Sequence, residues 1–315
     1  MNYAMILYIL GHLLRFEAIF LVLPTITGFI YKEDDAAIYL FLSVATYLLG
    51  SIMTCRQPRD KQLHTKEGFA TVAFGWIVLS MFGALPFVLT GDIPSYVDAL
   101  FETISGFTTT GASILSDVEA LSHANLFWRS FTHWIGGMGV FVFILAILPM
   151  IGGSTMHLMK AESPGPSVDK FVPKVKDTAK ILYLLYIGIT VLQIICLLLA
   201  GMPLFDTLTH TFGTVGTGGF GVKNSSIGGY TSLQQNIITF FMIASGVNYS
   251  AYFLIISKNF KDAFKMEEVR WYLGIILVAV AIITANTFSL YSGIGETLKH
   301  AFFQVASIIT TTGYS

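Results

Sequence analysis

Ser105-Gly106-Phe107-Thr108-Thr109-Thr110-Gly111-Ala112-Ser113 is a polar, glycine-bearing stretch that lies between two long apolar runs. The same combination of threonine and glycine returns in Gly216-Thr217-Gly218-Gly219-Phe220, and again in Thr310-Thr311-Thr312-Gly313-Tyr314-Ser315. One such stretch would be an ordinary turn. Because there are three, we interpret them as parts of one pore and the rest of the chain as the scaffold that holds them.

The three stretches belong to a longer repeat. With Gly111, Gly219 and Gly313 set in register, an aspartate stands 13 residues before each of the first two glycines, at positions 98 and 206. In the third copy, the residues from 310 to 313 match those from 108 to 111 one for one. Internal repeats that alternate membrane spans with loops are typical of pores and transporters whose site lies on the repeat axis.

The composition indicates a membrane protein. Hydrophobic residues make up 54% of the 315, and charged residues only 12%, whereas about 25% of the residues in a soluble domain are charged. Cys55 and Cys196 show neither disulfide nor metal-site spacing. The sequence carries no Walker A motif, no Rossmann glycine set, no zinc spacing and no hydrolytic triad. We therefore expect a protein that is not an enzyme.

The apolar runs predict an all-α membrane protein. We expect spans at about 4–30, 36–55, 68–91, 125–151, 177–200, 232–257 and 271–290. Three further helical segments, 95–108, 204–216 and 296–309, are too short to cross, since about 13 residues rise only about 20 Å. Each leads into a Thr/Gly stretch, and non-helical backbone at membrane depth must be buried in protein or line water. We therefore predict repeated units of span, re-entrant pore helix, filter loop and span around a central pore.

These elements divide the chain into four parts. Residues 1–60 form two extra N-terminal transmembrane helices, and residues 61–160 form the first pore repeat, with its filter at 108–113. The second repeat covers 161–260, with its filter at 216–221. The third covers 261–315, with its filter at 310–315, and is incomplete. Because a re-entrant loop would strand its last carbonyl groups if it ended at membrane depth, we expect a longer protein, with a fourth glycine about 95–125 residues beyond Gly313.

The charges predict which side of the membrane each loop faces. Thirteen of the 18 lysine and arginine residues lie at 56–67, 152–180 and 258–270, so we place the N-terminus and these basic loops in the cytoplasm. The pore helices then enter from outside. The outer side carries ten acids, which would attract cations to a pore mouth. Plain charge asymmetry between the two sides is the alternative, but it explains the scarcity of bases better than the abundance of acids, so we favour cation attraction. These acids are Glu33, Asp34, Asp35, Asp92, Asp98, Glu102, Asp117, Glu119, Asp206 and Glu296.

Threonine and glycine suit the coordination of a dehydrated cation. Inward-facing backbone carbonyl groups can replace the hydration shell of the ion, and glycine reaches the left-handed backbone conformation that such an array needs. Threonine adds a hydroxyl group, and a re-entrant helix points its negative end at the ion. The predicted filter residues are Thr108, Thr109, Thr110, Gly111, Ala112, Gly216, Thr217, Gly218, Gly219, Phe220, Thr310, Thr311, Thr312, Gly313 and Tyr314.

These units resemble those of the Trk/Ktr/HKT superfamily of potassium transporters. The residues from Thr311 to Tyr314 are also similar to the Thr-Val-Gly-Tyr-Gly filter of potassium channels. Three features resemble the bacterial TrkH branch, and together the resemblance covers essentially the whole chain. They are the pair of extra N-terminal spans, His133-Trp134-Ile135-Gly136-Gly137-Met138-Gly139 running on to Leu148-Pro149, and His210-Thr211-Phe212-Gly213-Thr214-Val215.

The resemblance implies four repeats around one pore, with Gly111, Gly219 and Gly313 as filter glycines and K+ as the transported ion. It implies no organic cofactor and no nucleic acid. It implies a homodimer in the bacterial inner (plasma) membrane and a cytosolic, TrkA-like nucleotide-binding regulator that would meet the loop at 156–176. Relatives that prefer sodium carry serine at the first filter glycine, so Gly111 favours potassium. The second copy departs from the pattern, with Gly216 and Gly218 where the other copies have threonine.

Several alternatives stay open. The same architecture could pass sodium, or re-entrant hairpins could serve a secondary transporter of an organic solute. Arg15 and Glu17 lie in the first apolar run, where charge is by default a functional hypothesis, but we favour a structural role. Gly136, Gly137 and Gly139 would allow close helix packing or act as a hinge, and packing is favoured. His210, which aligns with Glu102, could sense pH.

Overall fold

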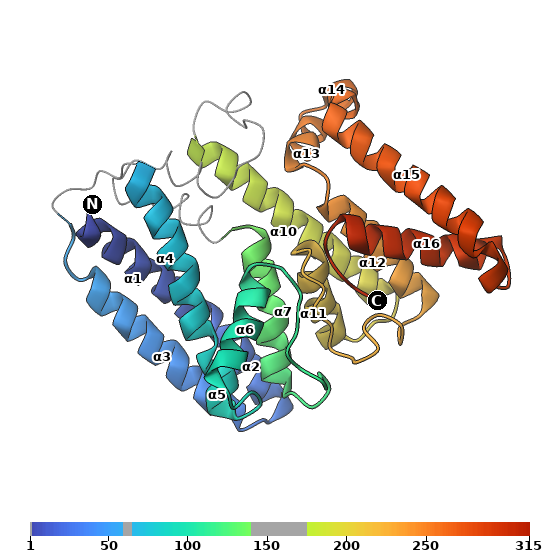
Figure 1. The fold of residues 1–315 in the computed structure, drawn as a ribbon. Helices are drawn as coiled ribbons and strands as arrows, with labels where there is room; N and C mark the ends of the chain where they lie inside the picture. Colours follow the sequence, from blue (N-terminus) through green and yellow to red (C-terminus); the bar gives the residue numbers. More distant parts are fainter. Residues whose placement is uncertain (1, 59–64, 140–174) are drawn as a thin grey trace. The chain divides into compact units, whose positions relative to one another are not determined.

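The computed structural model describes residues 2–58, 65–139 and 175–315 of the chain (Figure 1). The described parts are helices joined by turns and loops, and no strand occurs among them. The chain divides into two compact units. The first comprises Met1–Thr108 and Ala112–Lys180, and the second comprises Thr109–Gly111 and Ile181–Ser315. The short central part of the first Thr/Gly stretch therefore belongs with the second unit.

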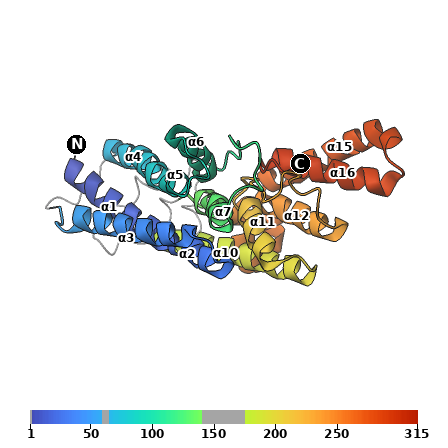
Figure 2. The ribbon, with the colours of Figure 1, turned by 90° about the horizontal axis from the view of Figure 1, so that it is seen from below.

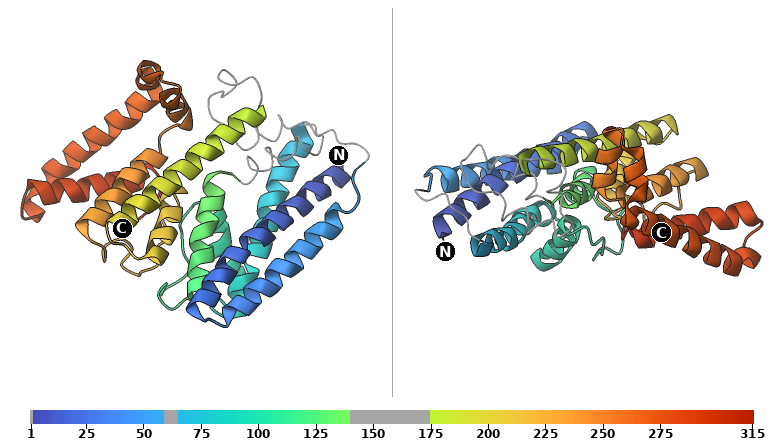
Figure 3. Two further views of the ribbon diagram at one scale, coloured as in Figure 1. Left: turned by 180° about the vertical axis from the view of Figure 1, so that it is seen from behind. Right: turned by 90° about the horizontal axis from the view of Figure 1, so that it is seen from above.

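The first unit begins with a long, almost continuous helix that packs against the next one. Helices α1 (Tyr3–Phe20) and α2 (Val22–Tyr31) together form the first predicted span, and α3 (Asp35–Thr54) forms the second. Figure 3 shows α1 and α3 running side by side. Their backbones touch, because a Cβ atom added to Gly50 would lie 2.6 Å from the carbonyl oxygen of Gly11. Small residues at helix contacts are typical of membrane bundles.

The rest of the first unit builds the first pore helix and its supports. Helices α4 (Thr65–Gly83) and α5 (Leu85–Thr90) precede α6 (Tyr96–Phe107), and α7 (His123–Gly137) follows it. The buried indole of Trp128 on α7 donates a 2.9 Å hydrogen bond to the carbonyl oxygen at the end of α4, on Gly83. This bond fixes the fourth predicted span against the third. The remainder of that span, up to residue 151, lies outside the described residues.

Two of the acids that the charge pattern assigns to the outer side cap the start of α7. The carboxylate of Glu33 accepts hydrogen bonds from the backbone N–H groups of His123, at 2.8 Å, and Ala124, at 3.1 Å. Asp92 accepts from the N–H group of Ser122 at 2.9 Å. The first N–H groups of a helix have no partner within the helix and carry its positive end. Both carboxylates are therefore engaged in capping, a use that the simple charge pattern does not reveal.

The second unit contains the other two pore helices. Helix α10 (Val175–Leu199) leads to α11 (Leu204–Val215), which is followed by α12 (Ser232–Ser245), α13 (Tyr249–Ile256) and α14 (Phe260–Lys265). Then come α15 (Glu267–Thr287), the 3-10 turn η2 (Phe288–Leu290) and α16 (Ile294–Ile309). Figure 2 shows α15 and α16 side by side. Their contact buries Ile276 and Val280 against Ala301 and Val305.

The predicted span at 232–257 is not one continuous helix. Helices α12 and α13 meet at 92°. The break follows Gly246, and the side chain of Asn248 then accepts a hydrogen bond from the N–H group of Ser250 at 2.9 Å, which starts α13. Asparagine is a strong N-cap residue. A glycine and a capping asparagine inside an apolar run were the overlooked signal.

Apart from the span at 125–151, whose second half lies outside the described residues, the other predicted elements are confirmed to within a few residues. Five described helical segments are long and apolar enough to cross a membrane, and the bent pair would be a sixth. The segments are Tyr3–Tyr31, Asp35–Thr54, Lys66–Thr90, Lys180–Leu199 and Glu267–Leu290. The short helices α6, α11 and α16 fall at the predicted re-entrant positions. The all-α membrane fold is therefore confirmed.

Candidate functional site

The three Thr/Gly loops share one backbone conformation. Each pore helix ends at a residue with ordinary helical dihedrals, and the next residue, a threonine, turns left-handed. Two residues later the glycine is left-handed again. The φ angles are 54° at Thr109, 54° at Thr217 and 59° at Thr311, then 74° at Gly111, 77° at Gly219 and 79° at Gly313. The three copies therefore repeat in backbone geometry at the register that the sequence predicts.

Hydrogen bonds at the helix ends account for the left-handed threonines. In the second copy, the N–H group of Thr217 donates to the carbonyl oxygen of Thr214 at 3.1 Å, and that of Gly218 donates to Gly213 at 2.9 Å. These two bonds form a Schellman motif, in which the residue after the cap is left-handed and is usually glycine. In the third copy, the N–H group of Thr311 likewise donates to Ile308 at 3.1 Å. Each loop thus leaves its helix by a sharp reversal.

A threonine in this conformation is unusual. A β-branched residue with positive φ is an outlier, and such strain costs on the order of 1–3 kcal/mol and persists only where the surroundings enforce it. The sequence predicts the left-handed conformation for the glycines alone, but Thr109, Thr217 and Thr311 adopt it as well. The missed signal is positional, because a threonine stands two residues before the glycine in every copy.

Two of the three predicted filter glycines, Gly111 and Gly219, are also required by space, whereas an added Cβ atom on Gly313 meets no atom within 4 Å. A Cβ atom on Gly111 would overlap the carbonyl oxygen of Gly218, and one on Gly219 would overlap the carbonyl oxygen of Thr312. Each of these two glycines therefore lies against a carbonyl group of the next copy, within the second unit. The three loops come together through backbone oxygens, and inward carbonyl oxygens are the ligands that selectivity filters use for dehydrated potassium.

The threonine hydroxyl groups of the third loop are mostly engaged with the loop itself. The hydroxyl of Thr310 donates to the carbonyl oxygen of Ala306 at 2.7 Å and lies 2.7 Å from the hydroxyl of Thr312. The hydroxyl of Thr311 donates to the carbonyl oxygen of Thr310 at 2.6 Å. These bonds fix the loop, so the carbonyl oxygens are the better candidate ligands in this copy.

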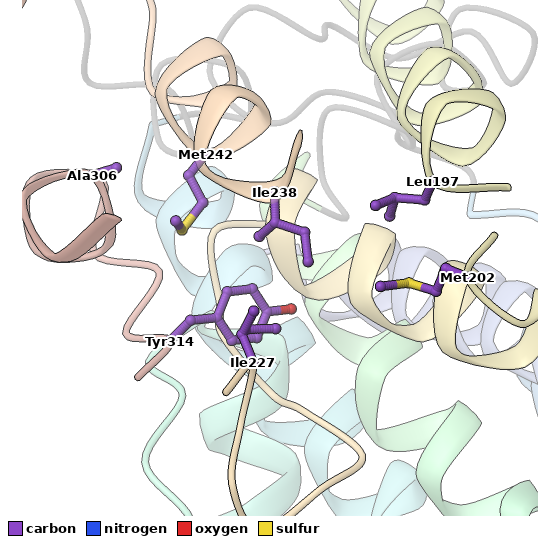
Figure 4. Packing of buried hydrophobic residues seen from close by; sticks show 7 residues of the cluster. All are labelled: Leu197, Met202, Ile227, Ile238, Met242, Ala306 and Tyr314. Carbon is purple, nitrogen blue, oxygen red and sulfur yellow. The ribbon is translucent and has the colours of Figure 1, made fainter. Parts of the chain in front are cut away.

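Tyr314 anchors the third loop in the core. Its side chain is 1% exposed and belongs to a hydrophobic cluster with Leu197, Met202, Ile227, Ile238, Met242 and Ala306 (Figure 4). The hydroxyl of Ser307 on α16 donates to the carbonyl oxygen of Tyr314 at 2.7 Å. Phe220, at the same register in the second copy, is also buried, whereas Ala112 in the first is exposed. The last predicted residue of the filter is therefore buried in the second and third copies and exposed in the first.

The phenol of Tyr314 also joins two copies. It donates to the carbonyl oxygen of His210 on α11 at 3.2 Å. A Cβ atom on Gly213 would lie 2.4 Å from this phenol oxygen, so the glycine of α11 makes room for the ring of the third loop. His210 is itself fully buried, with Nδ1 2.8 Å from the carbonyl oxygen of Asp206. The hypothesis that His210 senses pH remains a prediction.

The charged residues of the first apolar run contact neighbouring helices. The guanidinium group of Arg15 lies 3.1 Å from the hydroxyl of Tyr47 and over its ring. Glu17 is buried, and a Cβ atom on Gly83 would lie 3.0 Å from its carboxylate. The two side chains therefore contact different neighbours, which agrees with their separation of two positions on a helix. On α7, a Cβ atom on Gly136 would overlap the carbonyl oxygen of Phe107, the last residue of α6, which supports the packing role.

Comparison with known proteins places these observations in a family. The model of the family "TrkH: Cation transport protein" matches residues 37–315. The Trk system potassium uptake protein TrkH of Salmonella typhimurium is 38% identical over 100% of this chain and 67% of the relative. Its counterpart in Escherichia coli K12 is 36% identical over the same shares. The crystal structure of the potassium transporter TrkH from Vibrio parahaemolyticus superposes with a TM-score of 0.85 and 28% identity, covering 100% of this chain and 66% of that one. The chain thus spans about two thirds of the length of these relatives.

Proposed function

Because this chain belongs to the TrkH family of cation transport proteins, we propose that it forms the pore for potassium uptake across the bacterial inner (plasma) membrane. The observation that carries the proposal is the approach of the Gly218 and Thr312 carbonyl oxygens to the filter glycines of the neighbouring loops. The division into two N-terminal helices and pore repeats at 61–160, 161–260 and 261–315 is part of the same proposal.

In the proposed mechanism, potassium enters from outside, where acidic side chains raise the local concentration of cations. It loses its hydration shell among carbonyl oxygens of residues 108–112, 216–220 and 310–314. The pore helices point their negative C-terminal ends at the loops and so stabilise the positive charge. The ion then passes inward down its electrochemical gradient. Because coordination is by the backbone, the protein needs no organic cofactor for this step.

Selection of potassium over sodium requires that the carbonyl oxygens keep their spacing. The Schellman bonds of α11, the threonine bonds of the third loop and the anchoring of Tyr314 all hold the loops in place. Gly111 provides space for the carbonyl group of Gly218. A serine at that position would move this carbonyl group, and potassium preference would weaken as a result.

The partners are also a proposal. We propose a homodimer that works with a cytosolic, TrkA-like nucleotide-binding regulator at the basic cytoplasmic face. That face includes the loops at 56–67 and 258–270. Residues 152–174, which carry much of the predicted regulatory loop, lie outside the described part of the chain. The N-terminus would lie on the same side.

The test is uptake of rubidium into liposomes that hold the full-length protein and, in a parallel sample, the regulator. Strong competition by potassium with little by sodium is the expected result. Equal competition by sodium would identify a sodium-permeable transporter of the same architecture. Uptake of an organic solute without saturable rubidium entry would identify a secondary solute transporter and would refute the pore.

A further inference from the structure

The first pore helix carries a buried carboxylate that holds the chain just after the first filter loop. Glu102, on α6, is 1% exposed. One of its carboxylate oxygens accepts a hydrogen bond from the hydroxyl of Ser113 at 2.9 Å, and the other accepts from the N–H group of Ile114 at 2.9 Å. Ser113 follows the filter glycine Gly111 by only two residues. A side chain of the pore helix thus fixes the point where the loop ends.

Arg129, on α7, balances the charge. Its Nε atom donates to the same carboxylate oxygen that binds Ser113, and the two side chains are 3% and 0% exposed. A buried ion pair is weak evidence for stability, because the desolvation of both charges opposes their attraction. Its geometric effect is to connect α6, α7 and the chain that follows the first loop.

The repeat shows that this arrangement is particular to the first copy. The register of Glu102 is occupied by His210 in the second copy and Gln304 in the third, and that of Ser113 by Gly221 and Ser315. His210 Nε2 lies 3.9 Å from where a Cβ atom of Gly221 would stand. In the third copy, the carbonyl oxygen of Ser315 instead accepts from the N–H group of Ile227 at 3.2 Å. Among these described contacts, only the first copy uses a carboxylate.

We propose that Glu102 is a positioning residue for ion selection, holding the end of the first filter loop through Ser113 and Ile114 with Arg129 as its counter-charge. The inference rests on the proposed function of the loops as a potassium filter. Releasing Ser113 would let the backbone at Gly111 move, and the spacing of the carbonyl oxygens around the ion would then change. The effect should be a loss of discrimination between potassium and sodium.

The first test compares single hydroxyl changes in the full-length protein, measured by rubidium uptake with potassium or sodium as competitor. Ser113→Ala removes the hydroxyl that donates to Glu102 and accepts from the N–H group of Leu115 at 3.1 Å. It should make sodium a stronger competitor relative to potassium by about three- to tenfold, on the order of the effect of one hydrogen bond. Ser113→Thr keeps the hydroxyl and should retain the wild-type ratio. Ser116→Ala removes an exposed hydroxyl from the same segment and is the matched control.

The second test addresses Glu102 itself. Glu102→Gln alone would leave Arg129 buried without its counter-charge and could prevent folding, so it is paired with Arg129→Gln. Glutamine has one acceptor oxygen where the carboxylate has two, so the double variant should lose at least one of the bonds to Ser113 and Ile114 and give a monodisperse protein with reduced selectivity for potassium. If Ser113→Ala and the folded double variant both keep the wild-type ratio, Glu102 is only a structural residue. Absence of saturable, potassium-sensitive rubidium uptake in the wild type would instead refute the proposed function.

Discussion

The phenol of Tyr314, in the third Thr/Gly loop, donates a hydrogen bond of 3.2 Å to the carbonyl oxygen of His210 on α11. The residues are 104 positions apart and belong to different copies of the repeat. The loop that follows one pore helix is therefore fastened to the body of another. A change at this bond should affect the spacing between two filter loops as well as the conformation of one.

Tyr314→Phe removes the hydrogen bond to α11 and keeps the aromatic ring in place. The ring stays in the core cluster, so the protein should fold and lose only about 1 kcal/mol for one hydrogen bond. Selectivity for potassium over sodium should fall in the rubidium competition assay, because the third loop is no longer tied to α11. Tyr291→Phe, in which the ring is stacked on His300 outside the loops, is the control. If a folded Tyr314→Phe protein keeps the wild-type selectivity for potassium over sodium, the hydroxyl does not set the spacing between the two loops.

Gly219→Ala should abolish selective uptake. A Cβ atom there would overlap the carbonyl oxygen of Thr312, and the left-handed backbone disfavours any side chain. Gly188→Ala on α10 is the matched control, because a Cβ atom there meets no atom within 4 Å, and alanine favours a helix over glycine by about 1 kcal/mol. Normal selective uptake by Gly219→Ala would show that the loops do not approach one another as described.

Thr217 tests whether the left-handed threonines are strained. Thr217→Gly removes a side-chain penalty of roughly 1–2 kcal/mol, offset in part by the greater freedom of glycine in the unfolded chain. Thr217→Val keeps the branched side chain and removes the hydroxyl. We expect the glycine variant to melt at a higher temperature than the valine variant in a thermal unfolding assay. The reverse order would contradict a strained left-handed threonine.

Gly136→Ala tests the contact between α7 and the end of the first pore helix. The added methyl group would overlap the carbonyl oxygen of Phe107, and overpacking of this kind typically costs about 1–3 kcal/mol. The yield of folded protein and its melting temperature should both fall. Gly274→Ala on α15, where a Cβ atom meets nothing within 4 Å, should leave both unchanged. A stable Gly136→Ala protein would favour the hinge interpretation over packing.

The sequence predicted the elements that depend on length and periodicity. The three short helices were recognised because about 13 residues cannot cross a bilayer, and the register of Gly111, Gly219 and Gly313 is repeated in their φ angles. The threonines that turn left-handed were missed because their conformation is imposed by hydrogen bonds at the helix ends. No intrinsic preference of threonine indicates it.

Contacts between distant parts of the chain were beyond the sequence analysis. Nothing in the residues around Tyr314 indicates a bond to His210, and nothing near Glu33 indicates that its carboxylate caps α7. The bend after Gly246 is a different case, since a glycine followed by the capping residue Asn248 was visible in the sequence. The span at 232–257 was predicted from its apolar residues alone, although Gly246 and Asn248 indicate a break within it.

The central claim is that the three loops bind a dehydrated cation through their backbone. The most direct measurement is a crystal structure of the full-length protein with thallium, an anomalous scatterer that substitutes for potassium. We predict an anomalous peak within coordination distance of the carbonyl oxygens of Gly218 and Thr312, which weakens when excess potassium is added and persists when the same excess of sodium is added. Thallium bound elsewhere, with no peak between the loops, would contradict the account.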